Sequence, residues 1–203
     1  GLNSTQSGNL RPPDTHGASG GGKYCQIVNT RLACYSRSGG FAKQLDVSLA
    51  SFFNYFTQTI FDPRIEYDEV NDRWVAYAEA FAEDPTTQYI FWAVSNVSTP
   101  LAGWTVYQWD ADLLNNGDFW DYGQMGMTQD AVVLTANIFN PSFVGARMIS
   151  LPKARIYNAL GVTFPVWSGL DGTLAPAKVL DQHRDMFLIA APLWLPPGGT
   201  TIS

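Results

Sequence analysis

The sequence lacks any long apolar run and any concentrated basic region. No stretch of about 18 consecutive apolar residues occurs, so no segment is expected to span a membrane as a helix. The formal net charge is −6, with 12 Lys and Arg against 18 Asp and Glu. The basic residues form no stripe, which argues against a nucleic-acid partner. Charged residues make up only 15% of the chain, well below the roughly 25% of an average domain.

Sequence motifs for nucleophilic and nucleotide chemistry are also missing. No Gly-x-Ser-x-Gly elbow occurs, and the run Gly20-Gly21-Gly22-Lys23 lacks the spacing and the strand-to-helix context of a phosphate-binding loop. The chain has two cysteines and two histidines, and His16 lies far from His183 in sequence. This set is poor for zinc, so metal chemistry through Cys and His is not expected.

The two cysteines lie in one predicted hairpin. A two-residue turn at Asn29-Thr30 pairs residue 28 with 31 and, further from the turn, Cys25 with Cys34. Positions 25 and 34 fall on a non-hydrogen-bonded pair, where side chains come closest, so we predict a cross-strand disulfide. Two free thiols in a reducing cytosol are the alternative.

Several features favour a secreted, extracellular protein. The chain begins at Gly1 without a visible signal peptide, as a mature or trimmed secreted product would, and a disulfide suits an oxidising compartment. Asn3 and Asn96 each begin a glycosylation sequon, which matters only in a eukaryotic source.

Aromatic and turn-forming residues are abundant, and strand-turn-strand units recur along the chain. There are seven Trp, nine Tyr and twelve Phe, with 18 Gly and 12 Pro, a mixture typical of short strands and many turns. The hairpins recur roughly every 40 to 60 residues, the spacing of propeller blades. Their turns fall at 29–30, 71–72, 129–130 and 184–185.

The repeat predicts an all-β fold made of β-propeller blades, each of four antiparallel strands. An extended segment is expected over 1–22 and blades over 23–203, about three and a half in number. The predicted blades cover about 23–60, 61–119, 120–172 and 173–203, the last being incomplete. A β-sandwich with similar hairpins and a compact four-bladed ring are the alternatives. The one helical candidate is Pro152–Asn158, a single turn with Pro at its start.

Three segments carry a resemblance to a known family. Arg11–Ala18, Phe61–Asp68 and Asp121–Gly126 resemble the N-terminal half of a family of large secreted bacterial β-propellers, most of whose members are uncharacterised. The resemblance implies the fold and extends from Arg11 onward, but it departs from the family at Ala18–Lys23 and at the cysteine pair. Because open blades leave raw sheet edges, another chain or a missing segment is expected to complete the propeller.

The loops that enter the inner strands supply the candidate site residues. Asp14, Asp62 and Asp121 are expected to converge on the propeller axis, where they could hold calcium, which prefers several oxygen ligands. They could equally act as acid and base on a sugar bond, or each could cap its own turn. The full predicted ligand-binding set comprises Asp14, His16, Asp62, Arg64, Asp121, Tyr122 and Gln124.

Three functions remain open on the sequence. The main prediction is a non-catalytic extracellular module that recognises carbohydrate or protein through the propeller face. The first alternative is a glycan-active hydrolase or lyase that uses Asp62 or Asp121 as acid or base, and the second is a structural subunit of a surface assembly. Trp104, Trp109, Trp120 and Trp167 flank loops and are candidates for stacking on sugars.

Overall fold

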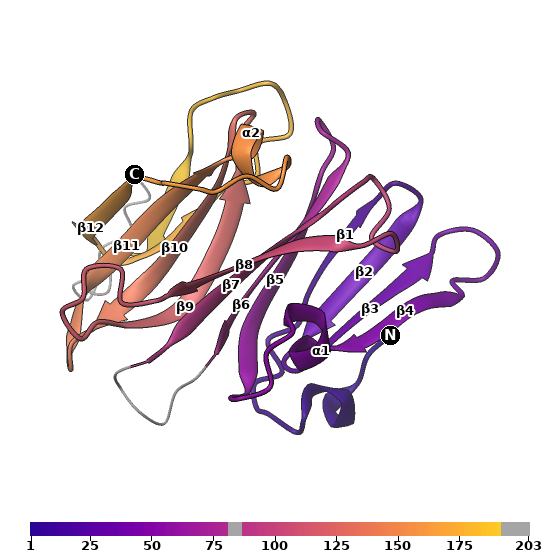
Figure 1. Cartoon of the computed structure of the whole chain (residues 1–203), viewed down its shortest axis with the longest axis horizontal. Coiled ribbons are helices and arrows are strands. Elements are labelled where there is room, and N and C mark those ends of the chain that lie inside the picture. The colour runs from indigo at the N-terminus through magenta and orange to yellow at the C-terminus, as the bar shows by residue number, and fades with distance from the viewer. Residues whose placement is uncertain (81–86, 192–203) are drawn as a thin grey trace, which may run out of the picture.

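The computed structural model describes residues 1–80 and 87–191, and its antiparallel sheets lie side by side in chain order (Figure 1). Within these residues there are three sheets of four strands and one of two strands. This arrangement confirms the prediction of all-β propeller blades. Residues 192–203 of the predicted fourth blade lie outside the described part of the chain.

The first blade contains the cysteine hairpin. Its strands are β1 (His16–Gly20), β2 (Lys23–Val28), β3 (Arg31–Ser36) and β4 (Lys43–Ser48). Strands β2 and β3 pair in the predicted register, with Val28 opposite Arg31 and Cys25 opposite Cys34. The Cys25–Cys34 disulfide is formed, which confirms that prediction. Strand β1 lies inside the stretch 1–22, and its partner is β2.

The remaining blades repeat the same meander. The second consists of β5 (Ile60–Asp68), β6 (Arg73–Ala80), β7 (Tyr89–Ser95) and β8 (Trp104–Asp110). The third consists of β9 (Phe119–Met127), β10 (Ala131–Phe139), β11 (Phe143–Pro152) and β12 (Val166–Leu170). The two-stranded sheet is β13 (Thr173–Pro176) paired with β14 (Leu188–Ala191).

Helical segments are short and lie outside the sheets. The helical candidate after Leu151 forms α2 (Lys153–Ile156). The sequence missed α1 (Leu49–Phe53) and the 3₁₀ turn η1 (Ser4–Ser7). Helix α1 begins after Ser48, whose hydroxyl oxygen accepts a hydrogen bond from the Ser51 amide at 3.1 Å. Ser48 is therefore the side-chain N-cap of this helix.

The core consists of two apolar layers, one on each face of the second blade. Trp74, Ala76 and Ala78 of β6 belong to the layer shared with the first blade, and Val75 and Tyr77 belong to the layer shared with the third. Because successive strand residues point to opposite faces, a strand covered on both sides must be apolar at nearly every position. This explains the continuous apolar runs in the sequence.

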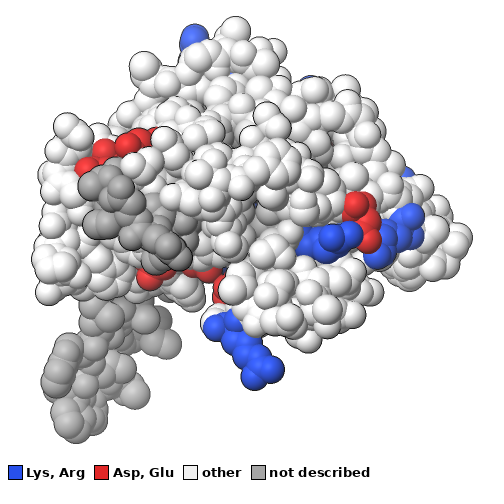
Figure 2. Space-filling model, turned by 60° about the horizontal axis from the view of Figure 1, so that its bottom comes forward, with Lys and Arg blue, Asp and Glu red and all other residues white. Residues whose placement is uncertain are grey.

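Charged groups are sparse on the surface, as the composition requires. The face drawn in Figure 2 is largely free of Lys, Arg, Asp and Glu, and its most visible charged grouping has basic and acidic side chains next to each other. None of the helices among the described residues is long and apolar enough to cross a membrane.

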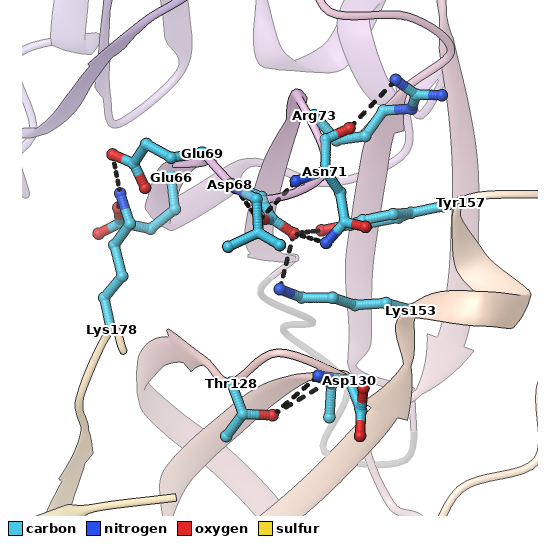
Figure 3. Close-up of polar contacts among 12 residues, drawn as sticks. Glu66, Asp68, Glu69, Asn71, Arg73, Thr128, Asp130, Lys153, Tyr157 and Lys178 are labelled. Atoms are coloured by element: carbon cyan, nitrogen blue, oxygen red, sulfur yellow. Dashed lines mark hydrogen bonds and ion pairs between the residues drawn. The ribbon is translucent and has the colours of Figure 1, made fainter. Parts of the chain in front are cut away.

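A buried carboxylate at the end of β5 joins the second and third blades (Figure 3). The Asp68 side chain is 2% exposed and pairs with Lys153 of α2 at 2.6 Å. It also accepts hydrogen bonds from Tyr157 Oη at 2.6 Å and Asn71 Nδ2 at 2.9 Å. Burial alone would raise the pKa of Asp68, but the hydrogen bonds from Lys153 and Tyr157 outweigh it, so the pKa is lowered.

We expect Lys153→Ala to lower the free energy of unfolding by about 3–5 kcal/mol, because it leaves the Asp68 charge buried without its partner. The double variant Asp68→Leu/Lys153→Met should lose less than the sum of the two single changes. Urea unfolding followed by tryptophan fluorescence measures both. Lys178→Ala is the control: its pair with Glu69 is more exposed and is worth about 1 kcal/mol or less. Equal losses for Lys153→Ala and Lys178→Ala would contradict the prediction.

Candidate functional site

The three predicted carboxylates lie where the inner strands of successive blades begin. Asp14 lies two residues before β1, Asp62 lies near the start of β5, and Asp121 lies near the start of β9. Asp62 and Asp121 each have a carboxylate oxygen within 4.8 Å of the other. A side-chain hydrogen bond joins Asp62 to Asp14. The expected convergence of three blades on one cluster of acidic groups is therefore present in the structure.

Irregular backbone turns these side chains toward one another. The pairing of β5 with β6 shifts register between Phe61 and Arg64, so Asp62 sits in a bulge with φ of 47°. The β9–β10 ladder shifts in the same way directly after Asp121, and Tyr122 there has φ of 59°. Bulges near strand ends re-aim side chains, and Asp tolerates the left-handed conformation better than most residues. A β-bulge near the start of the inner strand is thus present in both the second and the third blade.

A cavity of about 530 Å³ opens onto Asp14 and Asp62, and its volume is within the range of small-molecule sites. Asp14, Asp62 and the half-exposed Tyr122 line it. The other lining residues come from the N-terminal segment, the β2–β3 turn and the chain around the start of β5, and are Leu10, Arg11, Pro12, Asn29, Thr59 and Phe61.

Asp62 has the protonation behaviour of a general acid. Burial, followed by the negative charge and the hydrogen bond of Asp14, raises the pKa of Asp62 to about 7, although the nearby Arg64 opposes the shift. Burial also raises the pKa of Asp121. Like charges that share a partly desolvated site cannot all ionise, so near neutral pH the cluster retains at least one proton.

The sequence analysis missed Glu79, which lies on β6 beneath the cluster. Glu79 is fully buried, and one of its carboxylate oxygens lies within 4.8 Å of Asp62 and of Asp121. Its Oε1 accepts hydrogen bonds from Tyr77 Oη at 2.7 Å and from the Gly123 amide at 2.9 Å. Burial and the charge of Asp62 raise the pKa of Glu79 well above its ordinary range. The available signal was an acidic residue inside an otherwise apolar strand.

The remaining predicted ligand residues, His16, Arg64, Asp121 and Gln124, do not line the cavity. His16 Nδ1 is 3.0 Å from the carbonyl oxygen of Ile65, and burial, followed by the charge of Arg64, lowers its pKa. Arg64 donates from Nη1 to the carbonyl of Pro63 at 3.1 Å. Gln124 lies on β9 past the bulge, and its Nε2 is buried without an acceptor among the described residues. Of the seven predicted residues, only Asp14, Asp62 and Tyr122 line the cavity.

The candidate stacking tryptophans differ in exposure. Trp120 is fully buried and donates from Nε1 to Tyr77 Oη at 2.7 Å, so it cannot stack on a sugar and instead orients the Tyr77–Glu79 pair. Trp109 packs against Tyr107 and Phe164, and Trp104 packs against Phe52. Trp167 is 41% exposed.

The group of carboxylates that could hold a cation differs from the predicted one. Asp62, Glu79 and Asp121 each offer an oxygen within 4.8 Å of the others, and Asp14 is not among them. Glu79 Oε2 is buried and has no hydrogen-bond donor among the described residues. Carboxylate oxygens are the ligands that a hard cation prefers, and Glu79 Oε2 is free to serve as one. Calcium takes about six to eight oxygens, so further ligands would be needed.

We expect Glu79→Gln to become more stable relative to the wild type as pH rises. Because the folded-state pKa of Glu79 is raised above its unfolded value of 4.5, folding holds a proton that is lost at higher pH, and the wild type loses stability on that side. The amide cannot ionise. Chemical unfolding at pH 4, 6 and 8 measures the difference between the two proteins. Glu79→Ala is the control, since it leaves Tyr77 Oη without its acceptor and should be destabilised at every pH. A difference independent of pH would contradict the prediction.

Comparisons with known proteins bear on the fold. Neither a family model nor a curated protein sequence matches the chain. The exo-β-1,3-galactanase of Phanerochaete chrysosporium is similar in structure at 16% identity, with a TM-score of 0.49 over 91% of this chain and 44% of that one. An arabinanase of Bacillus subtilis is similar at 14% identity and a TM-score of 0.47, over 80% and 60% of the two chains. An endo-arabinanase of Bacillus licheniformis is similar at 15% identity and a TM-score of 0.47, over 86% of this chain and 64% of that one.

This chain therefore spans less than two thirds of the length of each of these structures, and a likeness at such low identity concerns the fold alone. The propeller part of the family resemblance is confirmed, but nothing ties the chain to the uncharacterised secreted family. The main functional prediction, a non-catalytic binding module, is contradicted by this comparison, because the similar structures are glycan hydrolases. The sequence could not reveal how closely the carboxylates approach one another.

Proposed function

We propose that this chain is part of a glycoside hydrolase whose acid and base are carboxyl groups at the propeller axis. The observation that carries the proposal is the cluster itself. Asp62 lines a cavity of about 530 Å³ and has a pKa of about 7. Asp121, from the next blade, has a carboxylate oxygen within 4.8 Å of one of Asp62. A paired acid and carboxylate is the general requirement for cleaving a glycosidic bond.

Each carboxyl group has a distinct role in this proposal. Asp62, protonated near neutral pH, donates its proton to the departing glycosidic oxygen. Asp121 is the partner carboxylate that acts on the other side of the scissile bond. Asp14 lies next to Asp62 and keeps its pKa high through charge and a hydrogen bond. Tyr122, half exposed at the cavity wall, offers an aromatic face for a sugar ring.

We expect Asp62→Asn to lower kcat about 10²–10⁴-fold, because the amide cannot donate the proton that the leaving group needs. The assay is release of reducing sugar from a panel of neutral glycans that includes β-1,3-galactan and arabinan. Asp171→Asn, at an exposed position, is the matched control and should retain full activity. Failure of the wild type to cleave any glycan, alone or with whatever completes its blades, would refute the proposal.

The pH–rate profile provides a second test. Since Asp62 must be protonated to act as the acid, kcat/KM should fall as pH rises through about 7, its pKa. With an activated aryl glycoside, whose leaving group needs little protonation, the loss above pH 7 should shrink. A profile that stays flat from pH 5 to 9 on both substrates would exclude Asp62 as the acid.

Calcium stays a proposal for the same cluster, with Asp62, Glu79 and Asp121 as the candidate ligands. Ligand carboxylates must be deprotonated, so binding would compete with the protons of the cluster and strengthen as pH rises. Adding CaCl₂ to EDTA-treated protein should raise Tm, more at pH 8 than at pH 6, and Asp121→Asn should abolish the shift. An unchanged Tm at millimolar calcium would exclude the ion.

Completion of the blades and secretion are further parts of the proposal. The β13–β14 sheet has two strands in the described part of the chain, and Leu180, Phe187 and Ile189 are well exposed there. Another segment or another chain that covers these side chains would complete the ring, since exposed sheet faces and edges favour association. The disulfide supports an oxidising, extracellular location.

A further inference from the structure

We propose that a second cavity, beside Phe56 in the loop between α1 and β5, binds a further sugar unit of a neutral glycan whose cleaved bond lies at Asp62. The inference rests on the proposed hydrolase function and narrows its substrate class. The substrate is then an oligosaccharide or polysaccharide that fills both cavities, rather than a glycoside of a single sugar. The sequence analysis assigned no role to Phe56.

The second cavity adjoins the one that Asp62 lines. Its volume is about 350 Å³, at the lower end of the range for small-molecule sites. Thr59 lines both cavities, and the consecutive turn residues Asn29 and Thr30 line one each. Thr59 precedes Asp62 by three residues, which span at most about 11 Å when fully extended. A short oligosaccharide can bridge that distance, so one ligand can occupy both cavities.

None of the described residues that line the second cavity is charged. The loop contributes an aromatic ring together with hydroxyl and amide groups, from Phe56, Thr57, Gln58 and Thr59. A phosphate, a sulfate or a uronic acid would have no counter-ion among these groups, so burying its charge there would be unfavourable. A neutral sugar has an apolar ring face and several hydroxyl groups, and both match this wall.

Phe56 is exposed although the residue before it packs against the core. Helix α1 ends at Phe53, and Asn54 follows it with φ of 53°. Tyr55 then packs against Tyr89 of β7, whereas the next side chain, Phe56, is 71% exposed. The segment is thus anchored to the second blade through one aromatic residue and offers a second aromatic ring to the cavity.

Tyr55 also holds the polar part of the wall in place. Its hydroxyl group donates to Gln58 Oε1 at 2.7 Å and is hydrogen-bonded to the Thr57 side chain. Its ring also contacts Phe91 of β7. A site whose polar groups are ordered before the ligand arrives loses less conformational entropy when it binds. These contacts therefore favour a preformed sugar site over a loop that orders only on binding.

An exposed aromatic residue is common on protein surfaces and is by itself no evidence of a site. What distinguishes Phe56 is the cavity that it lines and the connection of that cavity, through Thr59, to the cavity of Asp62. Phe41 is 64% exposed and lies between β3 and β4, at the other end of β3 from the Asn29-Thr30 turn. It is therefore a matched control for substitutions of Phe56.

The deciding experiment measures binding, by isothermal titration calorimetry on the full chain with Asp62→Asn, which leaves the glycan intact. The probes are neutral oligosaccharides of one to four units prepared from β-1,3-galactan and from arabinan. We expect affinity to increase with chain length. Adding Phe56→Ala should reduce the gain from monosaccharide to tetrasaccharide about 3–10-fold, because it removes one aromatic contact. Adding Phe41→Ala should leave the gain unchanged.

Two results would overturn the proposal. One is a gain in affinity with chain length that is the same with and without Phe56→Ala. The other is the absence of binding by every oligosaccharide, which would leave the exposed ring of Phe56 without a glycan ligand.

Two further substitutions at the same position test the aromatic contact itself. Phe56→Trp keeps a flat ring and should retain the gain in affinity, whereas Phe56→Leu keeps an apolar side chain without a ring and should lose it. Because Phe56 is 71% exposed, these variants should unfold at the same urea concentration as the parent. Equal binding by Phe56→Leu and Phe56→Trp would count against a sugar ring as the occupant.

Hydrolysis assays separate this inference from the proposed function. In the otherwise unchanged chain, Phe56→Ala should raise KM for the tetrasaccharide about 3–10-fold with little change in kcat, because the ring binds ground state and transition state alike. Cleavage with the same KM in the wild type and in Phe56→Ala would refute the second sugar site and leave the proposed function standing. A gain in binding that depends on Phe56, with no cleavage of any glycan, would refute the hydrolase and leave the sugar site standing.

Discussion

Desolvation of acidic side chains by stacked blades is the constraint on which the site depends. Asp62, Glu79 and Asp121 come from two blades whose apolar faces pack together, so Glu79 is fully buried and the two aspartates are partly buried. Burial is the largest cause of each raised pKa. The packing that stabilises the fold therefore also raises the pKa values of these carboxyl groups above that of an exposed carboxyl. Burial between packed blades thus contributes both to the stability of the fold and to the raised pKa values.

Buried charges elsewhere in the molecule behave differently because they have partners. Asp68 pairs with Lys153, and Asp118 pairs with Arg147, all with side chains at most 5% exposed. Hydrogen bonds from these partners lower the pKa values of both aspartates in spite of burial. Asp62 instead has other acids, Asp14 and Asp121, as neighbours that raise its pKa, and Arg64 is the positive charge that opposes them. The contrast separates structural ion pairs from the candidate catalytic cluster.

The approach of carboxyl groups from separate blades changes the functional interpretation from binding to the proposed hydrolysis. The positions of these residues explain why the sequence favoured a non-catalytic binding module. Asp14, Asp62 and Asp121 each precede or enter a strand, where a capping role is common. Only their approach to one another, and to Glu79 on a central strand, distinguishes an acid–base cluster from three separate caps.

Local chemistry in the sequence determined the all-β class, the hairpin register at Asn29-Thr30 and the Cys25–Cys34 bond, because each depends on neighbouring residues and on strand periodicity. The same local patterns placed Asp14, Asp62 and Asp121 at the inner-strand starts. Tertiary structure alone decided that Glu79 joins the cluster, that Trp120 is buried and that Phe56 lines a second cavity. Those features depend on how whole sheets stack and on bulges in β5 and β9, which bring together residues that are distant in sequence. Local sequence marks Glu79 as unusual within its strand but does not show which groups it meets.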